Sequence, residues 1–302
     1  MSMVRATSRG DQVRPGTEFR RILLATDFSP SAGLALQYAH ILCRQLRAKL
    51  FLVHVVPSEF PFVPPQSFDE TFASARQYAC EELQKLAAST GLTDVAHEEI
   101  LAHGGVWHNL QEIIQSEHID LVVLGTHGRS LSKKLTLGSV AEEIFRGADC
   151  PVLTVGPQAR VPMGTVPEIR NLLYATNFKP HAERASSAAY FLKREHAAHL
   201  SVLHVVEDAG DGSDVGNTIL RDFLVNRMRK TMPAVCLNHG EPDFLVRFGE
   251  AGKEILRTAV ESQTNLIILG LRHAEKLAGY LPSAVAYRIV CQAPYPVLTL
   301  RR

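Results

Sequence analysis

The sequence is poor in the features that mark several large protein classes. Its five cysteines are scattered and form no C-x-x-C pair, which argues against a disulfide framework or a zinc site. Its 32 basic and 31 acidic residues nearly cancel, so no overall charge draws the chain toward nucleic acid or an anionic membrane. No apolar run approaches the roughly 20 residues that span a bilayer, and the N-terminal segment lacks the apolar stretch of a signal peptide. We therefore expect a cytoplasmic protein with reduced thiols.

Apolar residues are abundant instead. They make up 46% of the chain against 21% charged residues, which is the composition of a folded globular protein rather than a disordered one. At 302 residues the chain is long for one domain and comfortable for two. We therefore expect two domains with a substantial hydrophobic core.

The two halves of the chain repeat the same short segments in the same order. The offset is 150 residues for the first two pairs and 145 for the last two, so the second copy is five residues shorter in between. The pairs are ILLATDF and LLYATNF (22–28 and 172–178), LFLVHVV and LSVLHVV (50–56 and 200–206), DLVVLG and NLIILG (120–125 and 265–270), and CPVLTV and YPVLTL (150–155 and 295–300).

Within each copy, short runs of Val, Ile and Leu alternate with segments of helical period. Runs such as LVVLG are apolar on both faces, which suits a parallel strand covered by helices on both sides. The alternation predicts an α/β fold, with one doubly wound, five-stranded parallel sheet per copy. In the first copy the expected strands lie near 21–26, 49–56, 96–102, 119–125 and 151–155, with helices over 30–47, 67–90, 105–117 and 138–147.

Composition also suggests where the domains begin and end. Residues 1–18 look like a disordered leader, and 158–168 read as a linker because several Pro and Gly occur there without periodicity. We therefore expect one domain over 19–157 and a second over 169–302.

One loop carries the pattern of an anion site. GTHGRSLSKKLTLGSVAEEI (125–144) joins an expected strand to an expected helix, with Gly125, Gly128, Gly138 and Ser139 at defined spacing. Glycine lets backbone N–H groups approach a ligand closely, and a helix N-terminus offers unpaired N–H groups and a positive dipole end. The loop therefore favours phosphate binding, although glycine turns and a serine at a helix start also occur without any ligand. It is neither a Walker loop nor a G-x-G-x-x-G fingerprint.

A carboxylate falls at the end of the first expected strand. Asp27 is not needed as a helix cap, because Ser29 and Pro30 already supply the cap and the first helical position. Ligands of open α/β sheets bind at the carboxyl ends of strands where the winding reverses, and an acidic residue there can bind ribose hydroxyls. A plain turn residue is the alternative. Lys133 and Lys134 are equally consistent with a triphosphate contact and with a solvated loop.

These residues together resemble the ATP-binding class of the universal stress protein family. Asp27 after the first strand and the G-x2-G-x9-G-S spacing carry the resemblance, which covers each copy from about residue 19 onward. It implies the Rossmann-like, adenine nucleotide alpha hydrolase-like fold with strand order 3-2-1-4-5, dimers paired through the fifth strand, and ATP with Mg²⁺ or Mn²⁺. The implied ligand-binding residues are Ala25, Thr26 and Asp27 at the base and ribose, Val55 at the adenine, and Gly125, Gly128, Arg129, Gly138, Ser139 and Val140 at the phosphates.

The second copy departs from this pattern. Asn177 replaces Asp27, and His273 replaces Gly128, where a side chain would intrude and disfavour positive φ. Ser283 and Ala284 replace the Gly-Ser pair, and Pro282 removes a backbone donor near the helix start. We expect this copy to bind ATP weakly or not at all. A different ligand, recruited by Arg272 and His273, is the alternative.

The sequence thus favours a non-enzymatic, nucleotide-dependent stress-response protein. The second copy would act as pseudo-dimer partner, further chains would associate into a homo-oligomer, and a regulatory protein of unknown identity would be the partner. No nucleophile and base stand together as hydrolases require, and His103 and His108 lack further ligands at metal spacing. The alternatives are a slow ATPase or self-phosphorylating protein, with Ser139 or Ser130 as acceptor, and a scaffold with a vestigial site.

Overall fold

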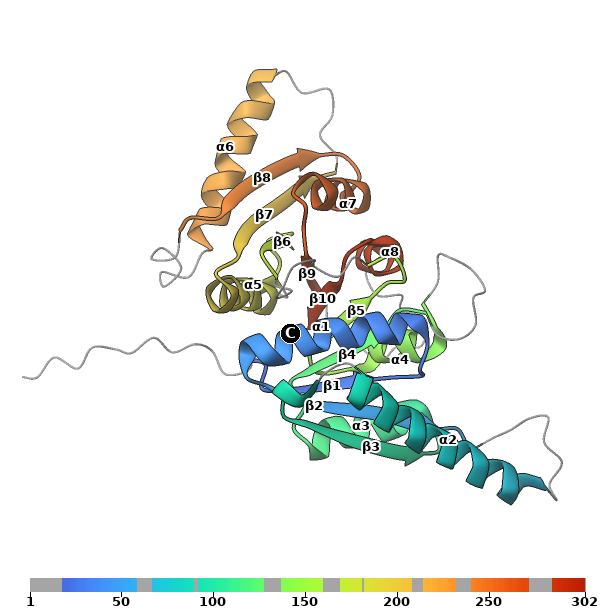
Figure 1. Cartoon of the computed structure of the whole chain (residues 1–302). Helices are drawn as coiled ribbons and strands as arrows, with labels where there is room; N and C mark the ends of the chain where they lie inside the picture. The colour runs from blue at the N-terminus through green and yellow to red at the C-terminus, as the bar shows by residue number, and fades with distance from the viewer. Residues whose placement is uncertain are drawn as a thin grey trace, which may run out of the picture.

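The computed structural model describes residues 18–58, 67–89, 92–127, 137–159, 169–180, 182–207, 214–231, 240–271 and 284–301. Within them the strands form one 10-stranded sheet of order β3-β2-β1-β4-β5-β10-β9-β6-β7-β8. In Figure 1 the first copy (blue to green) and the second (yellow to red) meet at the middle of the molecule, with α2 and α6 toward opposite ends. The expected leader and linker lie almost wholly outside the described residues.

The first copy contains every strand and helix that the periodicity predicts. All its strand pairs are parallel, and their order β3-β2-β1-β4-β5 confirms the doubly wound fold class. Its elements are β1 (Arg21–Ala25), α1 (Pro30–Leu46), β2 (Lys49–Val56), α2 (Phe68–Ser89), a 3-10 turn (Leu92–Asp94), β3 (His97–His103), α3 (Val106–Ser116), β4 (Leu121–Gly125), α4 (Ser139–Gly147) and β5 (Val152–Val155).

The second copy repeats this architecture. Its order β8-β7-β6-β9-β10 is the same 3-2-1-4-5 arrangement, again with parallel pairs. Its elements are β6 (Asn171–Ala175), α5 (Ala182–His196), β7 (His199–Val206), α6 (Asp214–Lys230), β8 (Asp243–Phe248), α7 (Ala251–Glu261), β9 (Leu266–Leu271), α8 (Ala284–Gln292) and β10 (Val297–Arg301).

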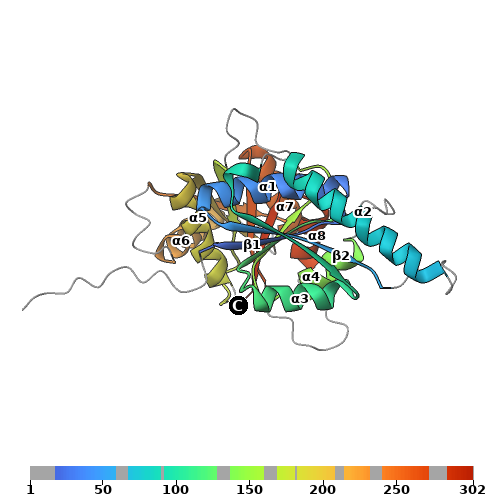
Figure 2. The same cartoon turned by 60° about the horizontal axis from the view of Figure 1, so that its bottom comes forward.

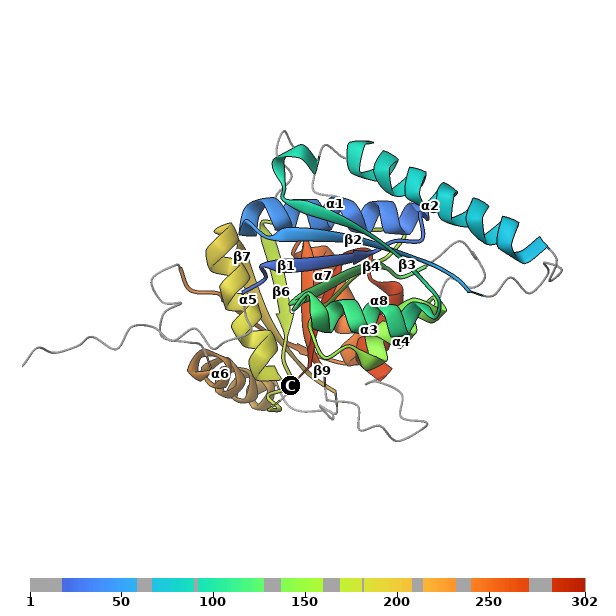
Figure 3. The ribbon, with the colours of Figure 1, turned by 90° about the horizontal axis from the view of Figure 1, so that it is seen from below.

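Helices cover both faces of the sheet, as the two-sided apolar strands require. Figures 2 and 3 show α1 and α2 on one face of the first copy and α3 and α4 on the other. One hydrophobic cluster joins α1, α2, α5 and α6 to the strands, and a second joins α3, α4, α7 and α8 to them. Each cluster therefore belongs to one face of the sheet and contains residues of both copies.

The two copies meet edge to edge through their fifth strands, β5 and β10, which pair antiparallel. Two buried hydroxyls repeat across this seam: Thr154 Oγ1 donates to Val297 O at 3.2 Å, and Thr299 Oγ1 donates to Val152 O at 3.2 Å. The intramolecular pairing expected from the sequence is thus confirmed. Because the two bonds are equivalent, the seam has approximate two-fold symmetry.

Three further observations limit the classes of site in the described residues. No helix there has both the length and the apolar character to cross a membrane. No group of three or more His, Cys, Asp or Glu side chains among them is arranged to hold a metal ion. The four described cysteines are free, and burial raises the pKa of the Cys150 thiol to about 12.

Candidate functional site

A cavity of about 550 Å³ opens at the carboxyl ends of β1, β2 and β4 in the first copy. The chain winds in opposite directions from β1 and β4, so the cavity lies where open α/β sheets bind ligands. The site residues predicted from the sequence that line it are Ala25, Thr26, Asp27, Val55, Gly125, Gly138, Ser139 and Val140. Gly128 and Arg129 lie outside the described residues.

The turn after β1 presents Asp27 to this cavity. Thr26 continues the sheet by donating from N to Val53 O at 2.9 Å, and Phe28 then adopts a φ of 61°. The Ser29 N–H donates to Asp27 Oδ1 at 3.0 Å, so the side chain closes an Asx turn. Asp27 therefore serves the turn and lines the cavity at once.

The second copy shows that this turn needs no charge. Lys179 N donates to Asn177 Oδ1 at 3.1 Å, and Phe178 has a φ of 58°, matching the first copy. An amide oxygen closes the turn as well as a carboxylate does. What Asp27 adds is therefore a negative charge at the cavity wall, which the turn itself does not require.

Gly125 and Gly138 have structural reasons that differ from those the sequence suggested. A Cβ at Gly125 would lie 2.8 Å from the backbone carbon of Ser31, so only glycine lets the end of β4 contact the first turn of α1. Gly138 has a φ of −62° and needs no left-handed conformation. Its N–H donates to Thr126 O at 2.9 Å, which fixes the start of α4 beside the end of β4.

The N-terminus of α4 reaches the cavity wall. Gly138 is the N-cap, no side chain of the described residues caps it, and Ser139, Val140 and Ala141 line the cavity. The first N–H groups of a helix have no intrahelical acceptor and carry the positive end of its dipole. This wall can therefore bind an anion, with the Ser139 hydroxyl as an additional donor.

The opposite part of the cavity is apolar. Val55, Val106 and Leu110 line it from β2 and α3, while Ala75 and Tyr78 line it from α2. Tyr78 is 52% exposed, so its ring borders the cavity without being buried in the core. Sequence reasoning missed α2 and α3 as walls, because helical period shows that a face is apolar but not which cavity it borders.

Two histidines lie near the carboxyl ends of the strands. His54 donates from Nδ1 to Thr26 O at 2.8 Å, and its ring contacts Phe28 with centroids 4.4 Å apart. His127 follows β4, and its Nδ1 lies 2.8 Å from Thr126 Oγ1. Its Nε2 is buried and has no hydrogen-bond partner in the described part of the chain. His127 also escaped sequence reasoning, although its place between Gly125 and Gly128 could have drawn attention to it.

The corresponding region of the second copy carries acidic side chains. The repeat matches Glu207 to Pro57, and Gly249 to Gly104, both glycines having positive φ. Glu207 Oε1 accepts from Ala251 N at 3.1 Å, at the start of α7. Beside it, Glu250 pairs with Arg288 of α8 and, at 2.8 Å, with Lys253. Carboxylates thus occupy the helix start where the first copy has neutral residues. Residues 272–283 and the Ala284 side chain lie outside the described part.

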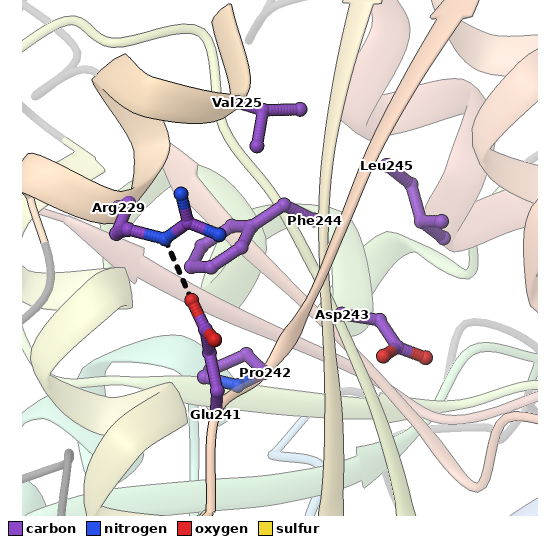
Figure 4. Close-up of a pocket in the computed structure, with 7 residues that line it drawn as sticks. All are labelled: Val225, Arg229, Glu241, Pro242, Asp243, Phe244 and Leu245. Carbon is purple, nitrogen blue, oxygen red and sulfur yellow. Dashed lines mark hydrogen bonds and ion pairs between the residues drawn. The ribbon is translucent and has the colours of Figure 1, made fainter. Parts of the chain in front are cut away.

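A second, shallower hollow of about 360 Å³ lies between α6 and the edge strand β8 (Figure 4). Arg229 pairs there with Glu241 at 2.6 Å and lies over the Phe244 ring, 5.6 Å from its centroid. Both charged side chains are about half exposed and neutralise each other, so this hollow offers little to a charged ligand.

The fold and the cavity define a tandem, Rossmann-like α/β protein with a switch-point crevice in its first copy. The model of the universal stress protein family matches residues 18–156 and 168–301. The chain therefore belongs to the universal stress protein family, in its two-domain form.

Individual relatives agree with this membership. A universal stress protein of Methanocaldococcus jannaschii is 29% identical over 142 residues, which are 45% of this chain and 82% of that protein. A putative universal stress protein of Staphylococcus haemolyticus is 30% identical over 156 residues, covering 50% of this chain and 92% of the relative. The crystal structure of a universal stress protein from Archaeoglobus fulgidus covers 96% of this chain and all of its own, with a TM-score of 0.69 and 19% identity, which supports the fold.

Proposed function

We propose that this protein binds ATP in its first copy, within a unit spanning 19–157, and acts as a nucleotide-dependent stress-response regulator. The second copy, 169–302, serves as its structural partner. The observation that carries the proposal is the single cavity that joins an apolar wall, the Asp27 carboxylate and the uncapped start of α4.

The cavity has a chemically suitable region for each part of an adenine nucleotide. The adenine suits the apolar part near Val55 and Leu110, and the Asp27 carboxylate can accept hydrogen bonds from the ribose hydroxyls. The phosphates suit the α4 start at Gly138 and Ser139. Gly128 and Arg129 join this part of the proposal on their sequence positions alone.

A divalent cation fits the site only together with the phosphates. The described residues contain no cluster of three metal-binding side chains, so Mg²⁺ or Mn²⁺ would be held mainly by the nucleotide. The Ser139 hydroxyl is the protein group best placed to assist. When bound, the cation would neutralise part of the phosphate charge.

The second copy is proposed to remain without nucleotide. Asn177 replaces the carboxylate that would accept from the ribose, and Ser283 and Ala284 stand in the sequence where the first copy has the Gly-Ser pair. We therefore expect one ATP per chain.

Calorimetric titration with Mg-ATP tests this proposal through an exchange of matched residues. Asp27→Asn should weaken ATP binding about tenfold, because it replaces a charged acceptor with a neutral one, a difference of about 1–1.5 kcal/mol, yet keeps the Asx turn seen at Asn177. Asn177→Asp in the second copy is the control and should change nothing. Two ATP per chain would refute the silent second copy, an unaffected Asp27→Asn would refute the ribose contact, and no binding would refute the function. ADP release from the same samples would reveal slow hydrolysis.

A further inference from the structure

His127 is held at one ring nitrogen, while its other ring nitrogen has no hydrogen-bond partner in the described part of the chain. Its backbone carbonyl accepts from Ser29 Oγ at 3.4 Å, and its Nδ1 lies 2.8 Å from Thr126 Oγ1. Both partners are buried, with Thr126 only 1% exposed. The imidazole is thereby held in place at the wall of the cavity.

The remaining nitrogen has no role within the described fold. Nε2 is shielded from solvent and pairs with no described group, although an unpaired buried polar atom costs about 1–3 kcal/mol. When the Thr126 hydroxyl donates to Nδ1, the ring keeps its proton on Nε2, which is then a donor. A donor fixed in this way lacks an acceptor among the residues that the structure describes.

The donor groups on one side of the cavity indicate the class of that acceptor. Among the described lining residues Asp27 alone carries a formal charge, and none is a lysine or arginine. His127 follows Gly125 directly after Thr126, on the side of the cavity where α4 begins. This part of the wall therefore offers helix N–H groups, the Ser139 hydroxyl and one imidazole donor, a set that matches phosphate oxygens.

We propose that His127 binds a phosphate group of the nucleotide, with Nε2 as the donor and Thr126 as the residue that sets its tautomer. This assignment rests on the proposed function and goes beyond it by naming the side chain that distinguishes a nucleotide from a nucleoside. His127 thus contributes to the affinity for ATP and not to the affinity for adenosine.

The test compares ATP with adenosine on the full chain, by calorimetry. His127→Leu removes the donor and should weaken ATP binding about tenfold, the effect of one hydrogen bond to a charged group, while adenosine binding stays within twofold. His127→Gln carries an amide donor near the position of Nε2 and should recover most of the ATP affinity. Melting of the variants without ligand is the stability control, because His127→Leu removes both the buried Nε2 and the hydrogen bond between Nδ1 and Thr126.

The possible results separate this inference from the proposed function. Equal losses for ATP and adenosine, or no loss for either, would overturn the role of His127 while leaving the adenine site standing. The role of His127 would also be overturned if the unmodified chain bound adenosine as tightly as ATP. An unmodified chain that binds neither ligand would overturn the proposed function and this inference with it.

Discussion

At the scale of single residues, several positions of the first copy both line the cavity and serve the fold. Gly125 is the last residue of β4, and the contact that requires glycine there is with the backbone of Ser31. Asp27 closes a turn that an asparagine closes equally well in the second copy. The charge of Asp27 is therefore a difference between the two copies that the turn itself does not require.

Two glycine-to-alanine changes should therefore act in opposite directions. Gly125→Ala should destabilise the protein by about 1–3 kcal/mol, because the new Cβ would force the end of β4 away from α1. Gly33→Ala is the matched control, since nothing lies within 4 Å of its added Cβ in α1, and it should stabilise by about 0.5–1 kcal/mol. Urea unfolding measures both, and a neutral Gly125→Ala would show that α1 and β4 adjust freely.

Sequence reasoning finds some of these residues and misses others for a physical reason. Asp27, Gly138 and Ser139 stand at the ends of strands and helices, so order along the chain already places them at one edge of a parallel sheet. Tyr78 and Leu110 reach the cavity from the faces of helices. Which face borders it depends on tertiary packing, which helical periodicity does not encode.

At the scale of elements, the seam between β5 and β10 contains hydrogen bonds whose contribution to stability can be measured one at a time. Thr154 and Thr299 are 1% and 3% exposed, and each hydroxyl donates across the seam. Period-2 and helical patterns predicted the strands and helices themselves. That PVLTV would pair with PVLTL came from the family resemblance, because similarity between two strands does not show that they are neighbours.

Replacing each threonine with valine tests the seam while preserving its shape. Thr154→Val and Thr299→Val should each cost about 1 kcal/mol, because each removes one buried hydrogen bond. Thr258→Val is the matched control in α7: its hydroxyl is buried with no described partner, so its loss should be neutral or stabilising. The midpoints of urea unfolding, compared between variants with the same m-value, measure these changes in stability. Equal effects at all three sites would show that the seam hydroxyls contribute nothing specific.

At the scale of the whole molecule, the two copies share both of their hydrophobic clusters. Both hydrophobic clusters cross the seam, and aromatic pairs join the copies on each face. Phe19 meets Phe191 with ring centroids 6.1 Å apart, and Phe145 meets Tyr287 at 6.2 Å. A disturbance in one copy should therefore reduce the stability of the other.

The single tryptophan makes this coupling measurable. Trp107 lies in α3 of the first copy, so its fluorescence reports that copy, whereas far-ultraviolet circular dichroism reports both. The two signals should give the same urea midpoint. A lower or higher midpoint for Trp107 would show that the first copy unfolds separately.

Acidification should reveal the same coupling through a histidine of the second copy. Burial, with a contribution from Arg227, lowers the pKa of His204 below its usual value of 6.5. The unfolded chain then binds the proton more readily than the folded chain. The contribution of neutral His204 to the free energy of unfolding is therefore present above pH 6.5 and is lost as the pH falls below that value. His204→Asn, whose amide donor lies near the position of Nδ1 and can still bond Thr176 O, should reduce the acid-induced drop in the Trp107 midpoint. An unchanged drop would contradict the prediction.

The place of β10 in the sheet has a consequence for how the protein is made. This strand follows all nine others in the chain, yet it lies between β9 and β5 at the centre of the sheet. As a ribosome releases the chain, the first copy is available to fold while the side of β5 still lacks its neighbour. Open strand edges invite pairing with other chains. The nascent first copy therefore has an open edge at β5, and this edge can pair with other chains. It is covered only when residues 297–301 have been made and β10 pairs with β5.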